Sequence, residues 1–184
     1  MAANVPAGCP NALHRVVHPT EKFYGGVLTH DGRGDNRVLY VTPGYQLVAL
    51  NAKDGHPVRG FGTGRIVDLK KDGDQVMDSI TGEVGLHATP VVTKNSIIVG
   101  AAHLPGGTPK SRQNEKGYIR GFDARTGKRQ WIFHTIPQLG EFGNDTWEKE
   151  SWVYTGNAGV WGQISVDEEL NMVYNAADVF ISTA

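Results

Sequence analysis

The stretch GFDARTGKRQW, residues 121–131, decides the fold that this sequence predicts. A short apolar run ends at Asp123, whose carboxylate can accept hydrogen bonds from backbone amides two and three residues further along. Gly127 can take the positive φ that such a turn requires without a steric penalty. Trp131 lies in the run that follows, where its ring can pack flat on a neighbouring sheet. The stretch therefore predicts two strands joined by a tight turn.

An earlier segment, VLYVTPGYQLVALNAKDG at residues 38–55, repeats this pattern. Asn51 and Gly55 stand where the later copy has its Asp and its Gly. Arg59 occupies the position of the Trp, so the aromatic contact of this copy is weaker or moves to Phe61. Two further segments, ATPVVTKNSIIVG and GQISVDEELNMVY, also correspond to each other. Self-similarity of this kind indicates a repeat architecture.

Each repeat reads as strand, hairpin, strand, turn and strand, which is one four-stranded antiparallel blade of a β-propeller. Helical periodicity is nearly absent, and TKNS and DEELN are typical of hairpin turns. The expected strands are Gly26–Thr29, Arg37–Thr42, Gln46–Asn51, Pro90–Thr93, Ser96–Ala101, Gly117–Asp123, Gln130–His134, Gly162–Val166 and Met172–Asn175.

We therefore expect an all-β, partial propeller over residues 23–184, after an irregular segment at residues 1–22. The expected blades cover approximately residues 24–61, 87–134 and 160–184. The spacing exceeds the roughly 40–45 residues of a plain blade because long segments are inserted. These insertions are residues 62–86, 103–116 and 134–160. Long ordered loops on a repeat scaffold often carry function.

Composition and charge exclude several classes of protein. The 184 residues are 39% hydrophobic and 20% charged, which is typical of a globular domain and not of a disordered chain. The net charge of −1 argues against a nucleic-acid partner. A single cysteine, Cys9, excludes an intrachain disulfide and a cysteine-based zinc site. The first residues lack a signal-peptide pattern, and no apolar run approaches the roughly 18 residues of a membrane helix.

The repeat turn carries a resemblance to a known family. Residues 121–131 match A-x-D-x-x-T-G-x-x-x-W, the tryptophan-docking repeat of the quinoprotein dehydrogenases, with Gly121 in place of Ala. Together with NDTWEKESWVYTGNAGVWGQISVDEELNMVY, residues 144–174, the chain resembles the glucose-dehydrogenase branch of that family. The resemblance covers roughly residues 26–174. It implies an eight-bladed propeller that binds pyrroloquinoline quinone (PQQ), of which this chain would form about two and a half blades.

The resemblance implies a role for Trp161, which stands alone among small residues. In the family, a Trp at this position stacks on the face of PQQ. An electron-rich indole held among small residues offers a flat surface to a planar, electron-poor ring system. The alternative for Trp161 is a blade-packing aromatic residue, which is the role that we expect of Trp131.

Further cofactor contacts follow from the same resemblance. His87 corresponds to a polar side chain that reaches the cofactor, and Gly100, Ala101 and Ala102 correspond to a stretch that passes close to it. Lys116 could pair with a carboxylate of PQQ. The alternatives are a surface histidine for His87 and a solvated charge for Lys116. We assign no catalytic residue and no metal ligand to this chain.

The resemblance implies oxidation of a sugar or an alcohol, with ubiquinone or a c-type cytochrome as electron acceptor and a periplasmic location. The family's catalytic Asp and its quinone-polarising Lys would lie beyond residue 184, so we expect the chain to be inactive alone. The segment AAHLPGG lacks the Glu that binds calcium in alcohol-oxidising relatives. Calcium would therefore belong to the complete enzyme.

Two alternatives remain open. Propellers with the same docking repeat also serve as non-catalytic scaffolds, although TWEKESW and Trp161 favour the enzyme lineage. An incomplete propeller also leaves strand edges and apolar blade faces uncovered. Such a chain would pack against the rest of the propeller or associate with itself.

Overall fold

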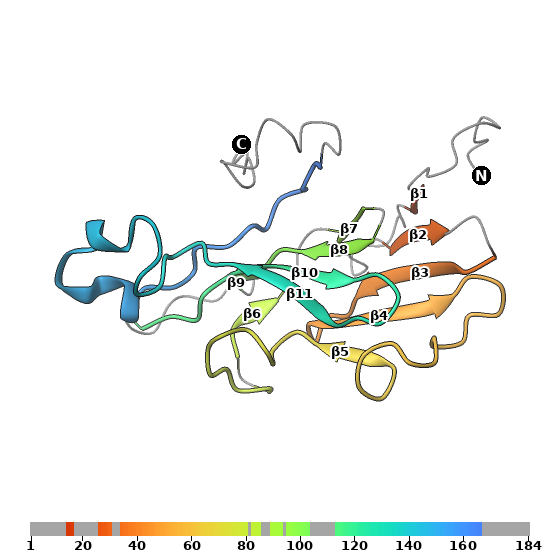
Figure 1. Cartoon of the computed structure of the whole chain (residues 1–184). Helices are drawn as coiled ribbons and strands as arrows, with labels where there is room; N and C mark the ends of the chain where they lie inside the picture. Colours follow the sequence, from red (N-terminus) through yellow and green to blue (C-terminus); the bar gives the residue numbers. More distant parts are fainter. Residues whose placement is uncertain are drawn as a thin grey trace.

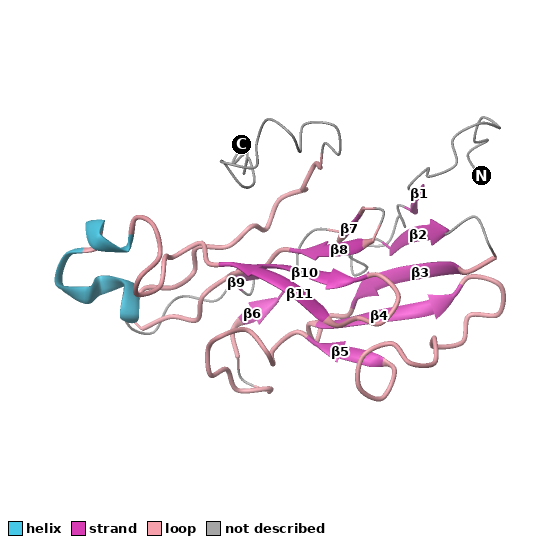
Figure 2. Ribbon diagram, viewed as in Figure 1, coloured by secondary structure: helices cyan, strands magenta, loops and turns pink. Residues whose placement is uncertain are grey.

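The computed structural model describes residues 14–16, 26–30, 34–80, 82–85, 89–93, 95–103 and 113–166. Within these residues the chain forms antiparallel sheets connected by long loops (Figures 1 and 2). Two larger sheets correspond to successive blades, and a small third sheet lies beside them. The all-β prediction is therefore confirmed.

The first blade is a five-stranded sheet in the order β1-β2-β3-β4-β5, and all neighbouring strands are antiparallel. Sequence analysis did not predict β1, which lies in the segment expected to be irregular, or β5, which lies in an expected insertion. Both are only three residues long and show no complete alternation. The strands are β1 (His14–Val16), β2 (Gly26–His30), β3 (Asn36–Val41), β4 (Gln46–Asn51) and β5 (Ile66–Asp68).

The second blade is a four-stranded antiparallel sheet in the order β11-β10-β8-β7. A tight turn joins β7 to β8, as TKNS predicted, and the Thr93 amide donates to the Ser96 carbonyl at 2.8 Å. A separate pair, β6 and β9, forms the small third sheet. These strands are β6 (Val84–Gly85), β7 (Val91–Val92), β8 (Ser96–Val99), β9 (Ala102–His103), β10 (Ile119–Asp123) and β11 (Arg129–Phe133).

The turn between β10 and β11 has the predicted geometry. The Asp123 carboxylate accepts hydrogen bonds from the amides of Arg125 at 3.1 Å and Thr126 at 2.7 Å. Gly127 follows with a φ of +70°, which glycine adopts without strain. The first copy repeats this arrangement, because Asn51 accepts from the Lys53 amide at 2.8 Å and a glycine with a φ of +73° follows.

The aromatic position differs between the two copies. Trp131 lies directly over Gly121 of the neighbouring strand, where an added Cβ would collide with the indole. This contact explains why Gly replaces the Ala of the docking repeat. In the first copy Arg59 is exposed whereas Phe61 is fully buried and reaches the Gly127 turn of the second blade. The prediction that the contact moves to Phe61 is confirmed.

The core lies between the two blades and contains residues from both. Leu39 and Leu47 come from the first blade, and Ile97, Val99 and Phe122 come from the second. All five are at most 2% exposed. Each buried side chain of this size contributes about 1.5–3 kcal/mol. The shared core therefore fixes how the second blade, and the loops it carries, sit on the first.

Residues 162–166 correct one strand prediction, because they form no strand in the structure. A strand needs a paired neighbour, and the predicted partner, Met172–Asn175, lies outside the described residues. The insertion before this segment forms two short 3₁₀ helices instead of a simple loop. These are η1 (Asn144–Thr146) and η2 (Glu148–Val153), at the left of Figure 1.

Candidate functional site

The candidate site is built on two loop segments that lie side by side. We call residues 114–117 the support segment and residues 154–160 the strap. The Asn114 amide donates to the Tyr154 carbonyl at 3.0 Å, and the Asn157 amide donates to the Glu115 carbonyl at 2.8 Å. These backbone hydrogen bonds fix the course of the chain that leads to Trp161.

Glycines bring the strap into close backbone contact with the segments beneath it. A Cβ at Gly100 would collide with the Val160 carbonyl, and a Cβ at Gly159 would collide with the Ala101 carbonyl. A Cβ at Gly117 would lie 2.7 Å from the Gly159 Cα, which is closer than real Cβ contacts. The strap therefore requires glycine at these positions to lie this close.

Trp161 comes directly after the strap and is 61% exposed, whereas its neighbour Val160 is buried at 8% exposure. The structure thus holds the backbone before Trp161 and leaves much of the indole open to solvent. A blade-packing aromatic residue would be largely covered by its neighbours. Among the described residues, the exposed indole is the feature that fits the stacking role best.

The structure places Gly100, Ala101 and Ala102 next to the strap, and all three are buried. The Tyr45 hydroxyl donates to the Gly100 carbonyl at 2.9 Å. The buried Arg120 donates in turn to the Tyr45 hydroxyl at 3.2 Å. Residues of both blades therefore hold this stretch.

Lys116 lies in the support segment and is half-buried. Burial lowers the pKa of its amine. The Nζ atom donates to the Val153 carbonyl at 2.9 Å, at the end of η2 and just before the strap. Lys116 therefore lies beside the same loop system as Trp161, with a solvent-accessible cation.

The side chains of His87 and His103 are not among the described parts of the structure. His87 lies outside the described residues, so its cofactor contact stays a prediction. Only the backbone of His103 is described, at the end of β9. Of the six residues that the resemblance assigned to the cofactor, Gly100 and Ala101 contact the strap just before Trp161, whereas the amine of Lys116 contacts Val153.

A cavity beside the support segment is too small for a cofactor. Its lining includes Tyr45, Gln75, Ala101, Lys116 and Arg120, and about 10 Å³ is accessible to the centre of a water molecule. That volume holds at most one water. A ligand of the size of PQQ would therefore not fit in this cavity.

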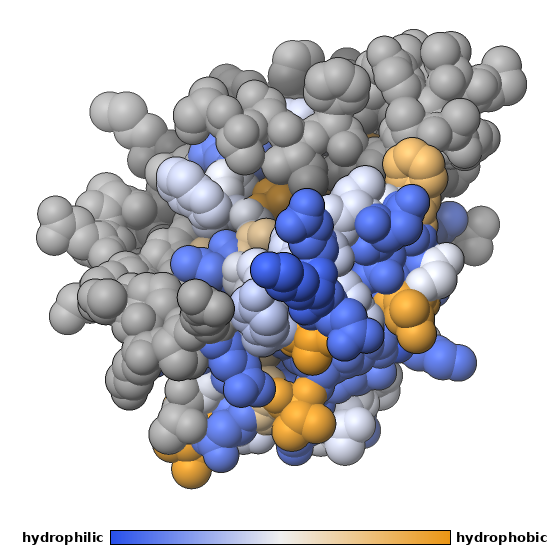
Figure 3. Space-filling model, turned by 90° about the vertical axis from the view of Figure 1, so that its left-hand side faces the viewer, coloured by the Kyte–Doolittle hydropathy of each residue, from blue (hydrophilic) through white to orange (hydrophobic). Residues whose placement is uncertain are grey.

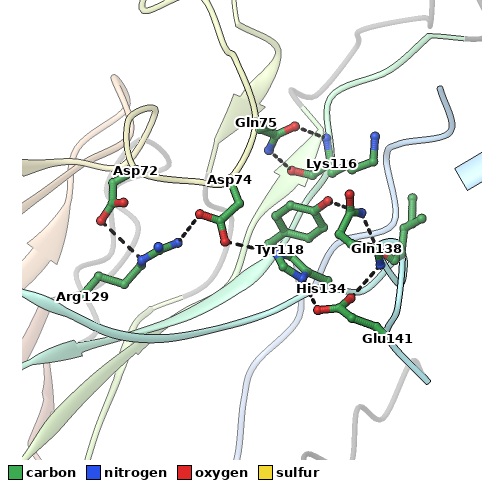
Figure 4. A network of polar contacts seen from close by, with 10 residues as sticks. Asp72, Asp74, Gln75, Lys116, Tyr118, Arg129, His134, Gln138 and Glu141 are labelled. Atoms are coloured by element: carbon green, nitrogen blue, oxygen red, sulfur yellow. Dashed lines mark hydrogen bonds and ion pairs between the residues drawn. The ribbon is translucent and has the colours of Figure 1, made fainter. Parts of the chain in front are cut away.

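A polar network that sequence analysis missed connects the two largest insertions (Figure 4). Asp74 accepts from Arg129 at 2.9 Å and lies 3.3 Å from Nε2 of His134. The other ring nitrogen of His134 lies 2.7 Å from Glu141. Asp72 adds a contact to Arg129 at 3.3 Å. No sequence signal could reveal these contacts, because Asp74 is 60 positions from His134.

The acids of the TWEKESW region do not take part in such a network. Asp145, Glu148 and Glu150 are the acidic residues of this region. All three are exposed, and in the described part of the chain their side chains receive no hydrogen bond. Residues 148–153 turn through the positive φ of Lys149 and Glu150 instead.

The described residues contain neither a cluster of metal-ligating side chains nor a helix that could span a membrane. No three His, Cys, Asp or Glu side chains gather there as metal ligands. No helix in that part of the chain is long and apolar enough to cross a membrane.

Comparison with known proteins agrees with this geometry. The PQQ family described as "Glucose/ethanol/alcohol dehydrogenase, beta-propeller domain" matches residues 16–179. The large subunit of glycerol dehydrogenase from Gluconobacter oxydans is 29% identical over 146 residues, 76% of this chain and 18% of the relative. Lupanine 17-hydroxylase [cytochrome c] from a Pseudomonas species is 31% identical over 169 residues, 85% of this chain and 21% of the relative.

The chain thus spans about a fifth of the length of the curated relatives it matches. Among solved structures, quinohemoprotein alcohol dehydrogenase ADHIIG from Pseudomonas putida HK5 superposes with a TM-score of 0.55 at 17% identity. That match covers 88% of this chain and 26% of the neighbour. The enzyme from Comamonas testosteroni gives a TM-score of 0.54 at 18% identity over 86% of this chain and 26% of the neighbour. These likenesses confirm the propeller fold.

Proposed function

The chain belongs to the PQQ family of glucose, ethanol and alcohol dehydrogenase β-propeller domains, and we propose that it supplies one face of the quinone site in a dehydrogenase that oxidises a sugar or an alcohol. The observation that carries this proposal is the exposed indole of Trp161 at the end of a tightly seated strap. A planar quinone can stack on such a surface with little steric conflict.

The donor set fits one face of PQQ, which is flat and carries three carboxylates. Trp161 offers a stacking surface, and Lys116 offers a cation that can make a charge-assisted contact with a carboxylate. A carboxylate beside Lys116 would oppose the effect of burial and favour the charged amine. Gly100 and Ala101 lie beneath the strap and fix its course just before Trp161. The described residues do not enclose the ligand, so the opposite face belongs to other parts of the enzyme.

When bound, PQQ supplies the redox chemistry, as cofactors do in general. The residues of this chain would bind and orient the quinone. The strap fixes the position of Trp161, and Lys116 fixes the in-plane direction by pairing with one edge of the ligand. We place the general base and the group that polarises the quinone outside this chain, and therefore expect no turnover from it alone.

The remaining parts of the proposal concern the complete enzyme. Electrons would pass to ubiquinone or to a c-type cytochrome, and the name of the similar lupanine 17-hydroxylase, which includes cytochrome c, supports the second acceptor. The enzyme would work in the periplasm, and calcium would bind at residues other than the AAHLPGG segment.

The test is a titration of the purified chain with PQQ, followed by tryptophan fluorescence. We expect saturable quenching that Trp161→Ala largely removes. Trp131→Phe is the matched control, because Trp131 lies over Gly121 away from the strap. Quenching that persists in Trp161→Ala, or is lost equally in Trp131→Phe, would contradict the proposal. A turnover assay with PQQ, calcium and glucose tests the expected inactivity, and rapid PQQ-dependent oxidation would overturn it.

A specific observation favours a second candidate, a non-catalytic scaffold. Several large hydrophobic side chains on the insertions are fully exposed, including Val76 and Phe142. Exposed hydrophobic side chains of this kind often mark a surface that binds another protein. A chain that binds no PQQ but associates through these loops would support the scaffold.

A further inference from the structure

We propose that Gln75 is a positioning residue for the quinone face: it holds the backbone of Lys116 and, through the support segment, the strap that carries Trp161. The inference rests on the proposed function for its consequence in PQQ binding. The contacts that carry it belong to the chain itself.

The side-chain amide of Gln75 binds both backbone polar groups of one residue (Figure 4). The Lys116 amide donates to Oε1 of Gln75 at 2.8 Å, and Nε2 of Gln75 donates to the Lys116 carbonyl at 2.6 Å. A primary amide carries a donor and an acceptor, so it can replace a neighbouring strand at this residue. Gln75 therefore binds the backbone of Lys116 in the way that a neighbouring strand would.

The support segment also binds the strap, through the hydrogen bonds of Asn114 with Tyr154 and of Asn157 with Glu115. The Thr135 hydroxyl adds a hydrogen bond to the Ala158 carbonyl. The support segment is thus held between Gln75 and the strap. Loss of the Gln75 contacts would let it shift together with Lys116 and the strap.

The loop that carries Gln75 is itself fixed. Its neighbour Asp74 contacts Arg129 at 2.9 Å and His134 at 3.3 Å, both on or next to β11 of the second blade. Gln75 therefore contacts the support segment from a loop tied to the rigid sheet. Because its loop is fixed in this way, Gln75 can hold the support segment in a defined position.

The experiment compares Gln75→Leu, Gln75→Glu and the control Gln130→Leu in the full chain. Leu removes both contacts at similar size, whereas Glu retains the acceptor for the Lys116 amide and loses the donor. Gln130 makes one exposed contact, with Ser96 at 2.6 Å, far from the support segment in the topology. Two quantities are measured: the Kd for PQQ, and hydrogen exchange in residues 113–117 and 154–161 of the ligand-free protein.

We expect Gln75→Leu to bind PQQ roughly tenfold more weakly, as the loss of two hydrogen bonds allows. Gln75→Glu should be intermediate, and Gln130→Leu should match the parent. Exchange should rise in residues 113–117 and 154–161 of Gln75→Leu while β3 and β4 stay protected. Parental affinity and parental exchange in Gln75→Leu would overturn the inference. If Gln75→Leu does not fold, Gln75→Glu decides: parental values in both measurements contradict the proposal.

The two readouts separate this inference from the proposed function. If the parent chain does not bind PQQ, the proposed function fails and hydrogen exchange alone decides the role of Gln75. If the parent binds PQQ and Gln75→Leu binds equally well, the positioning role fails and the proposed function stands.

Discussion

Gly121 and Trp131 show how a single residue can depart from a family pattern for a physical reason. The two residues face each other across β10 and β11, and the indole fills the space of a Cβ. The docking repeat carries Ala at this position. The Gly of this chain therefore allows a closer contact between ring and backbone.

We predict that Gly121→Ala destabilises the chain by about 1–3 kcal/mol, which is the usual cost of overpacking. The measurement is the free energy of unfolding in urea. In a Trp131→Leu background the same substitution should cost much less, because the smaller side chain leaves room for the methyl group. An equal loss of unfolding free energy in both backgrounds would show that the contact with the Trp131 ring is not the reason for Gly at position 121.

At the residue scale, the sequence predicted the turns well, whereas its cofactor-binding residues stay a prediction. Asp123 and Gly127 act locally, so their roles follow from spacing. Trp161 was singled out by its small neighbours, and its exposure agrees with that interpretation. Gln75 could not be predicted, because its partner is 41 positions away and no pattern relates them.

At the element scale, the long strands and the short β7 were predicted, whereas β1, β5, β6 and β9 were missed. β3, β4, β8 and β10 alternate or form compact apolar runs bounded by turn residues. β6 and β9 contain two residues each and exist only because they pair with each other. The strand expected at residues 162–166 does not form. Within the described residues this segment pairs with no other strand, and alternation of apolar residues alone does not make one.

The loop after β11 is expected to respond to acid through Glu141. Burial opposes ionisation, but the Gln138 amide and His134 outweigh it and lower the pKa of Glu141 below its ordinary value of 4.5. A lowered pKa in the folded state stabilises the chain above the unfolded pKa, and this contribution is lost as the pH falls through the folded pKa.

The variant Glu141→Gln tests this effect, because it keeps an acceptor oxygen and removes the charge. We expect the parent to be more stable than the variant at pH 7 and the difference to shrink as the pH falls below about 4.3. Urea unfolding of both proteins across this range gives the difference directly. A difference that is constant with pH would show that the charge contributes nothing.

At the scale of the whole molecule, the exposed hydrophobic residues belong mainly to the insertions. Val76, Ile80, Leu139 and Phe142 are each at least 80% exposed. Seen from the end that carries η1 and η2, hydrophobic residues lie as separate patches among hydrophilic ones (Figure 3). We propose that the rest of a propeller, or a second copy of the chain, covers them.

This proposal predicts that the isolated chain associates with itself in a concentration-dependent way. Phe142→Ser should weaken association several-fold because it removes a fully exposed ring. Lys53→Ser, on the exposed turn after β4, is the control. Sedimentation at increasing protein concentration measures the effect. A monomer at all concentrations, or equal behaviour of the two variants, would contradict the prediction.

The protein family could be predicted from the sequence, because the docking repeat combines a fixed residue spacing with residues that form a specific turn. The relative placement of the blades was not predictable. It depends on Arg120 and Tyr45, which join the two sheets over 75 positions.

The central claim is that Trp161 forms a stacking surface for PQQ. The most direct test is the set of indole N–H signals of the four tryptophans in ¹H–¹⁵N NMR spectra, assigned with Trp161→Phe and recorded during titration with PQQ. We expect a large, saturable shift of the Trp161 signal and small shifts of the other three signals. The Trp161 signal shifts most because the stacked ring system acts on it directly. An unchanged Trp161 signal at saturating PQQ, or equal shifts of all four signals, would contradict the claim.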